Sequence, residues 1–221
     1  MAAYSFANLK LGGSHVGVSI GEDGPSQMGL EDLAIFRAIP GMTIVAPCDA
    51  DEMTRLMPQT VEHDGPLYIR LGKGGDPIVS SDEHEFRIGK AVRMRQGGDA
   101  LIVTTGITAK VGLDAAEDLA GQGIAAGVLH VHTVKPLDTE AILDGAVSCK
   151  AVVVVEEHTV VGGLGSAVAE LLVDSDMLTG KRLRRIGFPD VFPEGYGSQA
   201  SMMARYGITA DRVAATVKEL I

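Results

Sequence analysis

The sequence predicts an α/β fold in two units, in which helices cover mostly parallel sheets. Apolar runs of strand length alternate along the chain with segments of helical periodicity. The run at residues 151–155 is continuously apolar, which is typical of strands covered on both faces. With 221 residues, of which 46% are hydrophobic and 22% charged, the chain is long enough to bury a core.

The first unit is predicted from chain breakers and one helix cap. Asp49, followed three residues later by Glu52, is a weak form of the capping box, so we expect a helix to begin there. Residues 72–82 contain glycines and a proline without periodicity, and we place a linker there. The expected elements are a loop over residues 11–25, a helix from about Gly29, a strand over 42–46, a helix over 49–63 and a strand over 67–71.

The second unit alternates more regularly, and we expect it to begin around Glu85. Thr209 can cap a last helix whose Val213, Val217 and Leu220 share one face. The expected strands cover residues 100–105, 124–134, 150–156 and 183–187, and the expected helices cover residues 107–121, 139–147, 166–173 and 210–220.

Charge and hydropathy exclude several classes of function. Lys and Arg number 19 against 29 Asp and Glu, and a net charge of -10 repels phosphate backbones, so no nucleic acid is expected as a partner. No apolar run reaches the roughly 18 residues that a membrane span needs. The first residues lack a signal-peptide pattern. We therefore expect no membrane contact and a cytoplasmic location.

The spacing of cysteine and histidine argues against a metal centre. Cys48 and Cys149 lie far apart and outside any CxxC pattern, so we expect reduced, packed thiols. His130 and His132 share one face of an expected strand but have no cysteine or acidic residue close by in the sequence. We assign them structural roles and predict no metal ligands.

Two further features invite a functional interpretation. Residues 162–165 precede a helix and could offer backbone N–H groups to an anion. Glu156, Glu157 and His158 form a charged strand end, which we interpret as an ordinary sheet edge.

The densest group of polar side chains lies in residues 12–29, which we call the glycine-rich loop. Six glycines and a proline surround His15, Glu22, Asp23, Ser26 and Gln27. Such a loop can bring backbone and polar side chains close to a ligand. It matches neither the dinucleotide fingerprint nor the P-loop. From composition alone, an ordinary surface turn is the competing interpretation.

The string SHVGVSIGEDGPSQMGLEDLAIFRAIPGMTIVAPCDADEM, from Ser14 to Met53, closely resembles transketolase, a family of thiamine-diphosphate enzymes. The resemblance combines the His-to-Asp spacing, the GEDGPS turn, the helix ending in RAIP and the strand before Pro-x-Asp. Weaker similarity at LIVTTGITAKVGLDAAEDL, VKPLD and VEEHTVVGGLGSAVAELL extends it over nearly the whole chain. The resemblance implies a truncated pyrimidine-binding domain plus linker over residues 1–82. A transketolase C-terminal domain, with a mostly parallel sheet between helices, would cover residues 83–221.

The resemblance also implies an activity, the transfer of a two-carbon ketol unit between phosphorylated sugars. His15 matches a histidine that lines the substrate channel, and we expect it to be catalytic. Asp23 matches an aspartate that hydrogen-bonds a sugar hydroxyl. Gln27 stands where many members have a second histidine; an amide can bind a hydroxyl but cannot exchange protons near pH 7. A solvent-exposed turn residue is the alternative for Gln27.

Two basic residues are the expected contacts to the sugar phosphate. Lys73 falls where the family has an arginine for this group, and Arg70 lies three residues earlier. A lysine offers a point charge instead of a bidentate fork, so the phosphate would be oriented less tightly or the preferred sugar would differ. For Arg70, a structural ion pair is the alternative.

The resemblance implies thiamine diphosphate with Mg²⁺ or Ca²⁺, bound only in the complete enzyme. The family's catalytic glutamate, its ring-stacking aromatic residues and its diphosphate and metal sites match parts that would precede this sequence, so its cofactor-binding residues are unknown. The expected partners are sugar phosphates, an N-terminal transketolase half or subunit, and a second copy in a dimer. We expect the isolated chain to be inactive.

Two alternatives stay open. The chain could be a non-catalytic dimerisation or scaffold module derived from this family, because an incomplete first unit should expose apolar surface. It could also be part of a relative that uses other substrates, such as a 1-deoxyxylulose-5-phosphate synthase-type enzyme or a 2-oxoacid dehydrogenase β subunit. The GEDGPSQM string argues against the second alternative, because that synthase more usually has a histidine at the Gln27 step.

Overall fold

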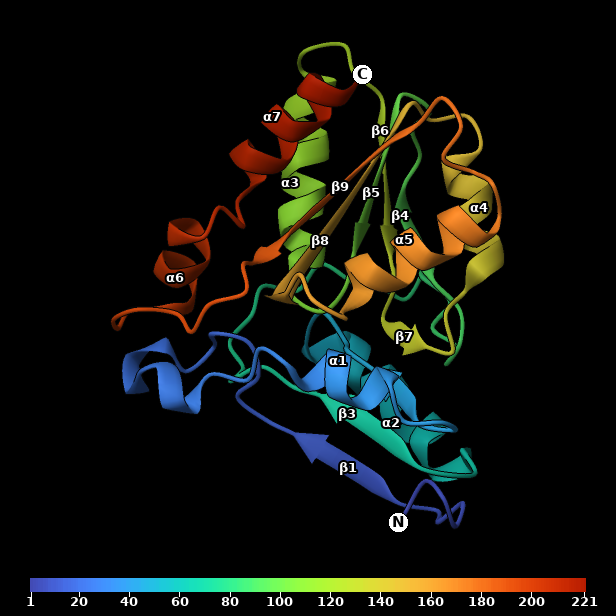
Figure 1. Ribbon diagram of the computed structural model, residues 1–221, viewed down its shortest axis with the longest axis vertical. Coiled ribbons are helices and arrows are strands. Elements are labelled where there is room, and N and C mark those ends of the chain that lie inside the picture. The colour runs from blue at the N-terminus through green and yellow to red at the C-terminus, as the bar shows by residue number, and fades with distance from the viewer.

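The computed structural model describes residues 1–221, and its two α/β units lie one against the other, with the chain termini at opposite ends of the molecule (Figure 1). Each unit has its own sheet, and both sheets are mostly parallel. The α/β architecture predicted from the alternation of apolar runs and helical segments is confirmed. None of the helices is both long enough and apolar enough to cross a membrane.

The first sheet has the strand order β1-β3-β2-β7, with β1, β3 and β2 parallel. Ile44 and Val45 point to opposite faces of this sheet, as neighbours in a strand must, and each face is covered by one helix. Leu33 of α1 packs on the Ile44 side and Leu56 of α2 on the Val45 side. The elements are β1 (Lys10–Gly13), α1 (Asp32–Arg37), β2 (Thr43–Val45), α2 (Ala50–Glu62) and β3 (Leu67–Arg70).

Helix α2 begins as its sequence predicts. The Asp49 carboxylate accepts a hydrogen bond from the Glu52 N–H at 2.8 Å, and the Glu52 carboxylate accepts one from the Cys48 N–H at 2.6 Å. Asp49 also accepts from the backbone N–H groups of Val79 and Ser80, at 2.8 and 2.7 Å. The predicted linker, which contains no helix or strand, is therefore fixed to the first unit at this cap.

The second sheet has the order β4-β6-β5-β8-β9, in which only β4 is antiparallel to its neighbour. Helices α3 and α7 cover one face and α4 and α5 the other (Figure 1). The strands are β4 (Val92–Arg95), β5 (Ala100–Thr104), β6 (Ala126–His130), β8 (Ala151–Thr159) and β9 (Arg182–Phe188). The helices are α3 (Thr108–Ala120), α4 (Thr139–Ala146), α5 (Leu164–Asp174), α6 (Gln199–Arg205) and α7 (Ala210–Leu220). The Thr209 hydroxyl caps α7, as predicted.

The prediction of one strand over residues 124–134 is wrong. The chain leaves the second sheet after His130 and joins the first sheet as β7 (Thr133–Lys135), antiparallel to β2. Val131 packs in the core of the second unit and Val134 in that of the first. The apolar pattern continues through the crossing because both sides are buried, so hydropathy alone does not reveal it.

Three elements were not predicted: β1, β4 and α6. Strand β1 contains two glycines and begins one residue before the segment that we expected to be a loop. It forms because its backbone pairs in parallel with β3, from Lys10 opposite Leu67 to Gly13 opposite Arg70. Tertiary pairing therefore overrides weak local propensity at this edge.

The end of β8 joins the two units. Because side chains alternate along a strand, Glu156 points to the α5 face and Glu157 to the opposite face. Glu156 accepts from the N–H groups of Leu164 and Gly165, at 2.7 and 2.9 Å, at the start of α5. Burial raises the pKa of both carboxyls to about 7, against the lowering effect of the backbone donors at Glu156 and of the Arg70 charge at Glu157. This strand end is fully buried, so its interpretation as an ordinary sheet edge is wrong.

Arg70, at the end of β3, forms the centre of this junction. Its Nε and Nη2 donate to the two carboxylate oxygens of Asp32, at 2.8 and 3.1 Å. Nη2 also reaches the carbonyl oxygens of Gly29, at 3.2 Å, and Glu157, at 2.9 Å. Burial raises the pKa of Asp32, but the charge and hydrogen bonds of Arg70, together with the Tyr68 hydroxyl and His158, outweigh this effect and hold that pKa below its ordinary value. The pair fixes α1 and the end of β8 to the first sheet.

Replacing Arg70 by methionine should destabilise the protein strongly, because it leaves the largely buried Asp32 carboxylate without its charged partner. We expect the free energy of unfolding in urea to fall by about 3–5 kcal/mol. The double variant Arg70→Met/Asp32→Leu should lose less than Arg70→Met alone, because no unpaired charge remains. This role would be contradicted if Arg70→Met unfolded at the same urea concentration as the wild-type protein.

The raised pKa of Glu157 predicts a pH effect of known sign. Its stabilising contribution is fully present below about pH 4.5, the ordinary pKa, and is lost as the pH rises through about 7. The unfolding free energy of wild type, measured against Glu157→Gln, should therefore fall from pH 4.5 to pH 8, on the order of 1–3 kcal/mol. Urea titrations of both proteins across this range test it, and a constant difference would show that Glu157 keeps its ordinary pKa.

Candidate functional site

The glycine-rich loop starts where β1 ends, beside the end of β3. The Val16 N–H donates to the Leu71 carbonyl oxygen at 3.1 Å, so the chain segments that carry His15 and Lys73 leave neighbouring parallel strands at the same edge of the sheet. Gly17 and Gly29 exchange two backbone hydrogen bonds, at 2.7 and 3.1 Å, which close the loop. The edge beyond the carboxyl ends of parallel strands is the usual place for ligands in α/β proteins.

His15 lies in an unusual backbone conformation just after β1. Its φ of 63° is in the left-handed region, which costs energy for a residue with a side chain and often occurs at functional sites. The Nδ1 atom lies 2.7 Å from the Ser14 hydroxyl, and the side chain is half-buried. The imidazole therefore keeps its other nitrogen available as a donor or acceptor.

Asp23 and Gln27 occupy two short 3₁₀ turns of the loop, η1 (Gly21–Asp23) and η2 (Pro25–Gln27), and both side chains are exposed. Gln27 has one long hydrogen bond, from its amide to the Ser26 hydroxyl at 3.5 Å. No hydrogen bond joins His15, Asp23 and Gln27 to one another. The three residues therefore share one loop without forming a hydrogen-bonded cluster.

Lys73 and Arg70 have different environments, although only three residues separate them. The Lys73 ammonium lies 3.6 Å from the Glu22 carboxylate of the glycine-rich loop, and the two side chains are 49% and 52% exposed. Arg70 points inward and is occupied by Asp32 and two backbone carbonyls. Arg70 therefore lies in a structural ion pair, which is the alternative that we gave for it from the sequence.

A cavity of about 150 Å³ opens beside Lys73, between the glycines on either side of it and the start of α2. Cys48, Asp49 and Asp76 are among the residues that line it, and Ile107 lines it from the second unit. Ile107 was not expected in this wall, because only the tertiary fold brings it to the cavity.

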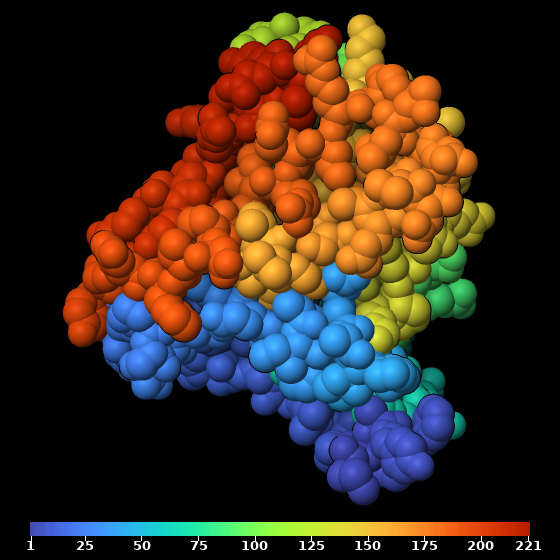
Figure 2. All heavy atoms as spheres, viewed as in Figure 1, coloured from blue at the N-terminus to red at the C-terminus, as the bar shows by residue number.

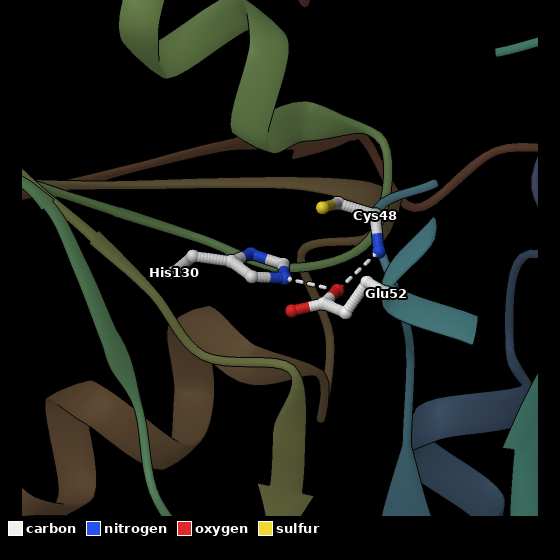
Figure 3. Close-up of side chains that lie close together, drawn as sticks. All are labelled: Cys48, Glu52 and His130. Carbon is white, nitrogen blue, oxygen red and sulfur yellow. Dashed lines mark hydrogen bonds and ion pairs between the residues drawn. The ribbon is translucent and has the colours of Figure 1, made fainter. Parts of the chain in front are cut away.

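Cys48, Glu52 and His130 form a buried cluster in which one potential ligand atom of each lies within 4.8 Å of the others (Figure 3). The same Glu52 oxygen accepts from the Cys48 N–H, at 2.6 Å, and contacts His130 Nε2 at 3.0 Å. Burial raises the pKa of Glu52, but the His130 charge and hydrogen bond outweigh it and lower the pKa to about 2. Both cysteines are free and buried, as expected. The contacts of Glu52, which cap the start of α2 and pair with His130, account for the cluster.

The residues before α5 do not offer a free anion site. The N–H groups of Leu164 and Gly165, which the sequence suggested for an external anion, bind the Glu156 carboxylate of the chain itself. A Cβ at Gly163 would lie 2.1 Å from that carboxylate, so no space is left for a ligand. An internal carboxylate therefore occupies this helix N-terminus.

Comparison with known proteins gives two family matches. Residues 1–75 match the transketolase pyrimidine-binding domain, and residues 89–213 match the transketolase C-terminal domain. A solved structure described as a split-gene transketolase, an inactive β4 tetramer, superposes with a TM-score of 0.88 at 36% identity. The alignment covers 99% of this chain and 68% of that one.

Curated relatives agree with these matches. The 6-deoxy-6-sulfo-D-fructose transketolase subunit SqwH of Clostridium sp. (strain MSTE9) is 43% identical over 99% of this chain and 66% of its own length. The 1-deoxy-D-xylulose-5-phosphate synthase 1 of Geobacter sulfurreducens is 40% identical over 91% of this chain and 32% of its own length. The chain thus spans two thirds or less of these two relatives. It belongs to the transketolase family, of which it contains the pyrimidine-binding and C-terminal domain regions.

Proposed function

We propose that this chain supplies the sugar-binding loop of a transketolase-type transferase, which moves a two-carbon ketol unit from a ketose to an aldose. The observation that carries the proposal is the position of His15 and Lys73 after neighbouring parallel strands. The loop that bears Asp23 and Gln27 follows His15 and returns to Lys73 through the contact with Glu22. A polyol with an anionic end needs this combination of hydroxyl partners and one cation.

Each residue has a role that its position permits. The exposed Lys73 ammonium binds the anionic end of the sugar, and Asp23 accepts hydrogen bonds from sugar hydroxyls. Gln27 binds a hydroxyl through its amide. His15, the proposed catalytic residue, exchanges a proton with a sugar hydroxyl through the nitrogen that Ser14 leaves free. Arg70 is left out of the sugar contacts because its donors are used internally.

Enzymes of this family use thiamine diphosphate, which stabilises the carbanion that ketol transfer requires. The residues of this chain do not fit that cofactor by themselves. The one cluster able to hold a divalent ion has its Glu52 oxygen already engaged twice. The buried side-chain atoms without a partner belong to Arg55, Thr105, His132 and Thr216, all outside the glycine-rich loop. We therefore derive no step through the cofactor and assign its metal, Mg²⁺ or Ca²⁺, to another part of the complete enzyme.

The proposed partner is a protein that supplies the remaining cofactor-binding residues, either as a separate N-terminal subunit or as part of a longer chain. The description of the 36%-identical structure as a split-gene enzyme supports a separate subunit. Ile35, Val161 and Phe192 are 59%, 54% and 80% exposed and surround a groove of about 370 Å³, which supports association with another chain or copy. A scaffold module is the second candidate, and it predicts association without sugar binding.

The anionic group of the sugar is a phosphate in our proposal. The name of the Clostridium relative, which specifies a 6-sulfo sugar, makes a sulfonate the competing choice. A lysine in place of a bidentate arginine suits either group, because an ammonium acts as a point charge. A synthase reaction is the third choice, given the Geobacter relative. A donor screen with phosphorylated and sulfonated ketoses separates the first two choices.

We expect ketol transfer when the chain is mixed with a complementary N-terminal subunit, thiamine diphosphate and Mg²⁺, and none from the chain alone. Release of aldose from a phosphorylated ketose, followed by coupled assay, measures the activity. Asp23→Asn should raise the KM for the sugar about tenfold, because a carboxylate that accepts strong hydrogen bonds from sugar hydroxyls is lost. Association with the partner but no turnover of any ketose would favour the scaffold.

The Glu22–Lys73 pair predicts opposite effects of two substitutions on sugar affinity. Lys73→Ala should raise the KM for an anionic sugar about tenfold or more, because a charge-assisted contact is lost. Glu22→Gln should lower that KM about two- to fivefold, because an exposed pair is weak and its carboxylate competes with the substrate anion. Steady-state kinetics at low ionic strength measures both. Equal KM values for the two variants would exclude Lys73 from the anion site.

A further inference from the structure

The buried Glu157 carboxylate lies beneath the glycine-rich loop, although it belongs to the second sheet. Its Oε1 atom accepts from the Val18 N–H at 2.9 Å and from the Gln199 side-chain amide at 2.9 Å. Val18 lies 139 residues away in the chain. One oxygen atom therefore ties the loop of the first unit to both β8 and α6 of the second.

The packing against Glu157 leaves no space for a side chain at Gly17. A Cβ built there would lie 2.3 Å from the Glu157 carboxyl carbon, and φ at Gly17 is 64°, a conformation that glycine adopts freely. The backbone of the loop is thus pressed directly onto the carboxylate. Gly17 also forms the backbone bridge that closes the loop, so the contact acts at its base.

The segment before α6 extends the same contact along the loop. The Gly197 N–H donates to the Gly21 carbonyl oxygen at 3.1 Å, and a Cβ at Gly24 would meet the Tyr196 ring at 2.6 Å. Figure 2 shows the blue atoms of the N-terminal part directly against the orange atoms of the C-terminal part on this face. The turn that carries Asp23 therefore rests on the second unit.

The carboxylate of Glu157 makes no hydrogen bond to Arg70, although the charges of the two groups interact. Arg70 Nη2 donates to the backbone carbonyl of Glu157, at 2.9 Å, whereas the Glu157 carboxylate binds Val18 and Gln199. The backbone of this residue would keep the Arg70 contact after any side-chain substitution. The hydrogen bonds of the side chain are directed at the loop and at α6.

We propose that Glu157 is a positioning residue for sugar binding: it fixes the base of the glycine-rich loop from the second unit and thereby sets where Asp23 lies relative to Lys73. Without this acceptor, the buried Val18 N–H has no partner, and the loop gains freedom between its two ends. Glu157 acts through the loop and does not itself contact the sugar. The kinetic part of the inference rests on the proposed function, whereas the structural part does not.

Hydrogen exchange of the full chain, followed by mass spectrometry, tests the structural part. Glu157→Ala should increase the exchange rate of peptides covering residues 16–24 roughly tenfold or more. Glu157→Gln should stay close to wild type, because its Oε1 still accepts both hydrogen bonds. Gln199→Ala, which removes one of the two donors without burying an unpaired group, should give a smaller increase and serves if Glu157→Ala does not fold.

Glu156→Ala is the matched control, because Glu156 is the neighbouring buried carboxylate and binds α5 instead of the loop. Hydrogen exchange of the Glu156→Ala variant should increase at residues 164–165 and not at residues 16–24. The proposal would be overturned if residues 16–24 of Glu157→Ala exchanged at the wild-type rate. It would also be overturned if Glu156→Ala showed an equal increase at these residues.

Kinetics of the complete enzyme, assembled with its N-terminal partner, tests the consequence for the sugar. Gln199→Ala and Glu157→Ala should raise the KM for the ketose several-fold with a smaller change in kcat, and Glu157→Gln should restore it. A fall in kcat with unchanged KM would contradict a positioning role in sugar binding. If the wild-type assembly has no activity, the proposed function fails, while hydrogen exchange still decides whether Glu157 holds the loop.

Discussion

The guanidinium of Arg70 carries a charge that cannot be removed by deprotonation and is buried where the two units meet. It is tolerated because four hydrogen bonds surround it, two to Asp32 and two to the carbonyl oxygens of Gly29 and Glu157. These partners belong to α1, the end of the glycine-rich loop and β8. The same group therefore fixes the helix after the loop, the exit of the loop and the strand beneath it.

Because side chains alternate along β8, the two buried carboxylates at its end point to opposite faces and have different partners. Glu156 closes the N-terminus of α5 and Glu157 holds the base of the glycine-rich loop. The sugar-contact residues that we propose, Asp23 and Lys73, lie exposed on loops whose bases are fixed by buried polar groups. This division suits a binding loop, because exposed side chains can meet a ligand while the backbone that carries them stays in place.

Local signals made some of the structure predictable and left the rest hidden. Asp49 and Thr209 act on backbone N–H groups three residues away, so their helix starts could be inferred from the sequence. The passage of β7 into the first sheet and the contact between Val18 and Glu157 depend on residues far apart in the chain. The site residues came from the resemblance of one string, while the inward direction of Arg70 and the burial of Glu157 required the fold.

We expect the two units to unfold as one cooperative body, because this buried polar junction joins them. Hydrogen exchange measured at increasing urea tests it most directly, because each peptide then reports the free energy and surface exposure of its own opening. Peptides covering β3 and β8 should open with the same free energy and the same dependence on urea. Opening of β3 at lower urea, with a smaller slope and with β8 still protected, would contradict it.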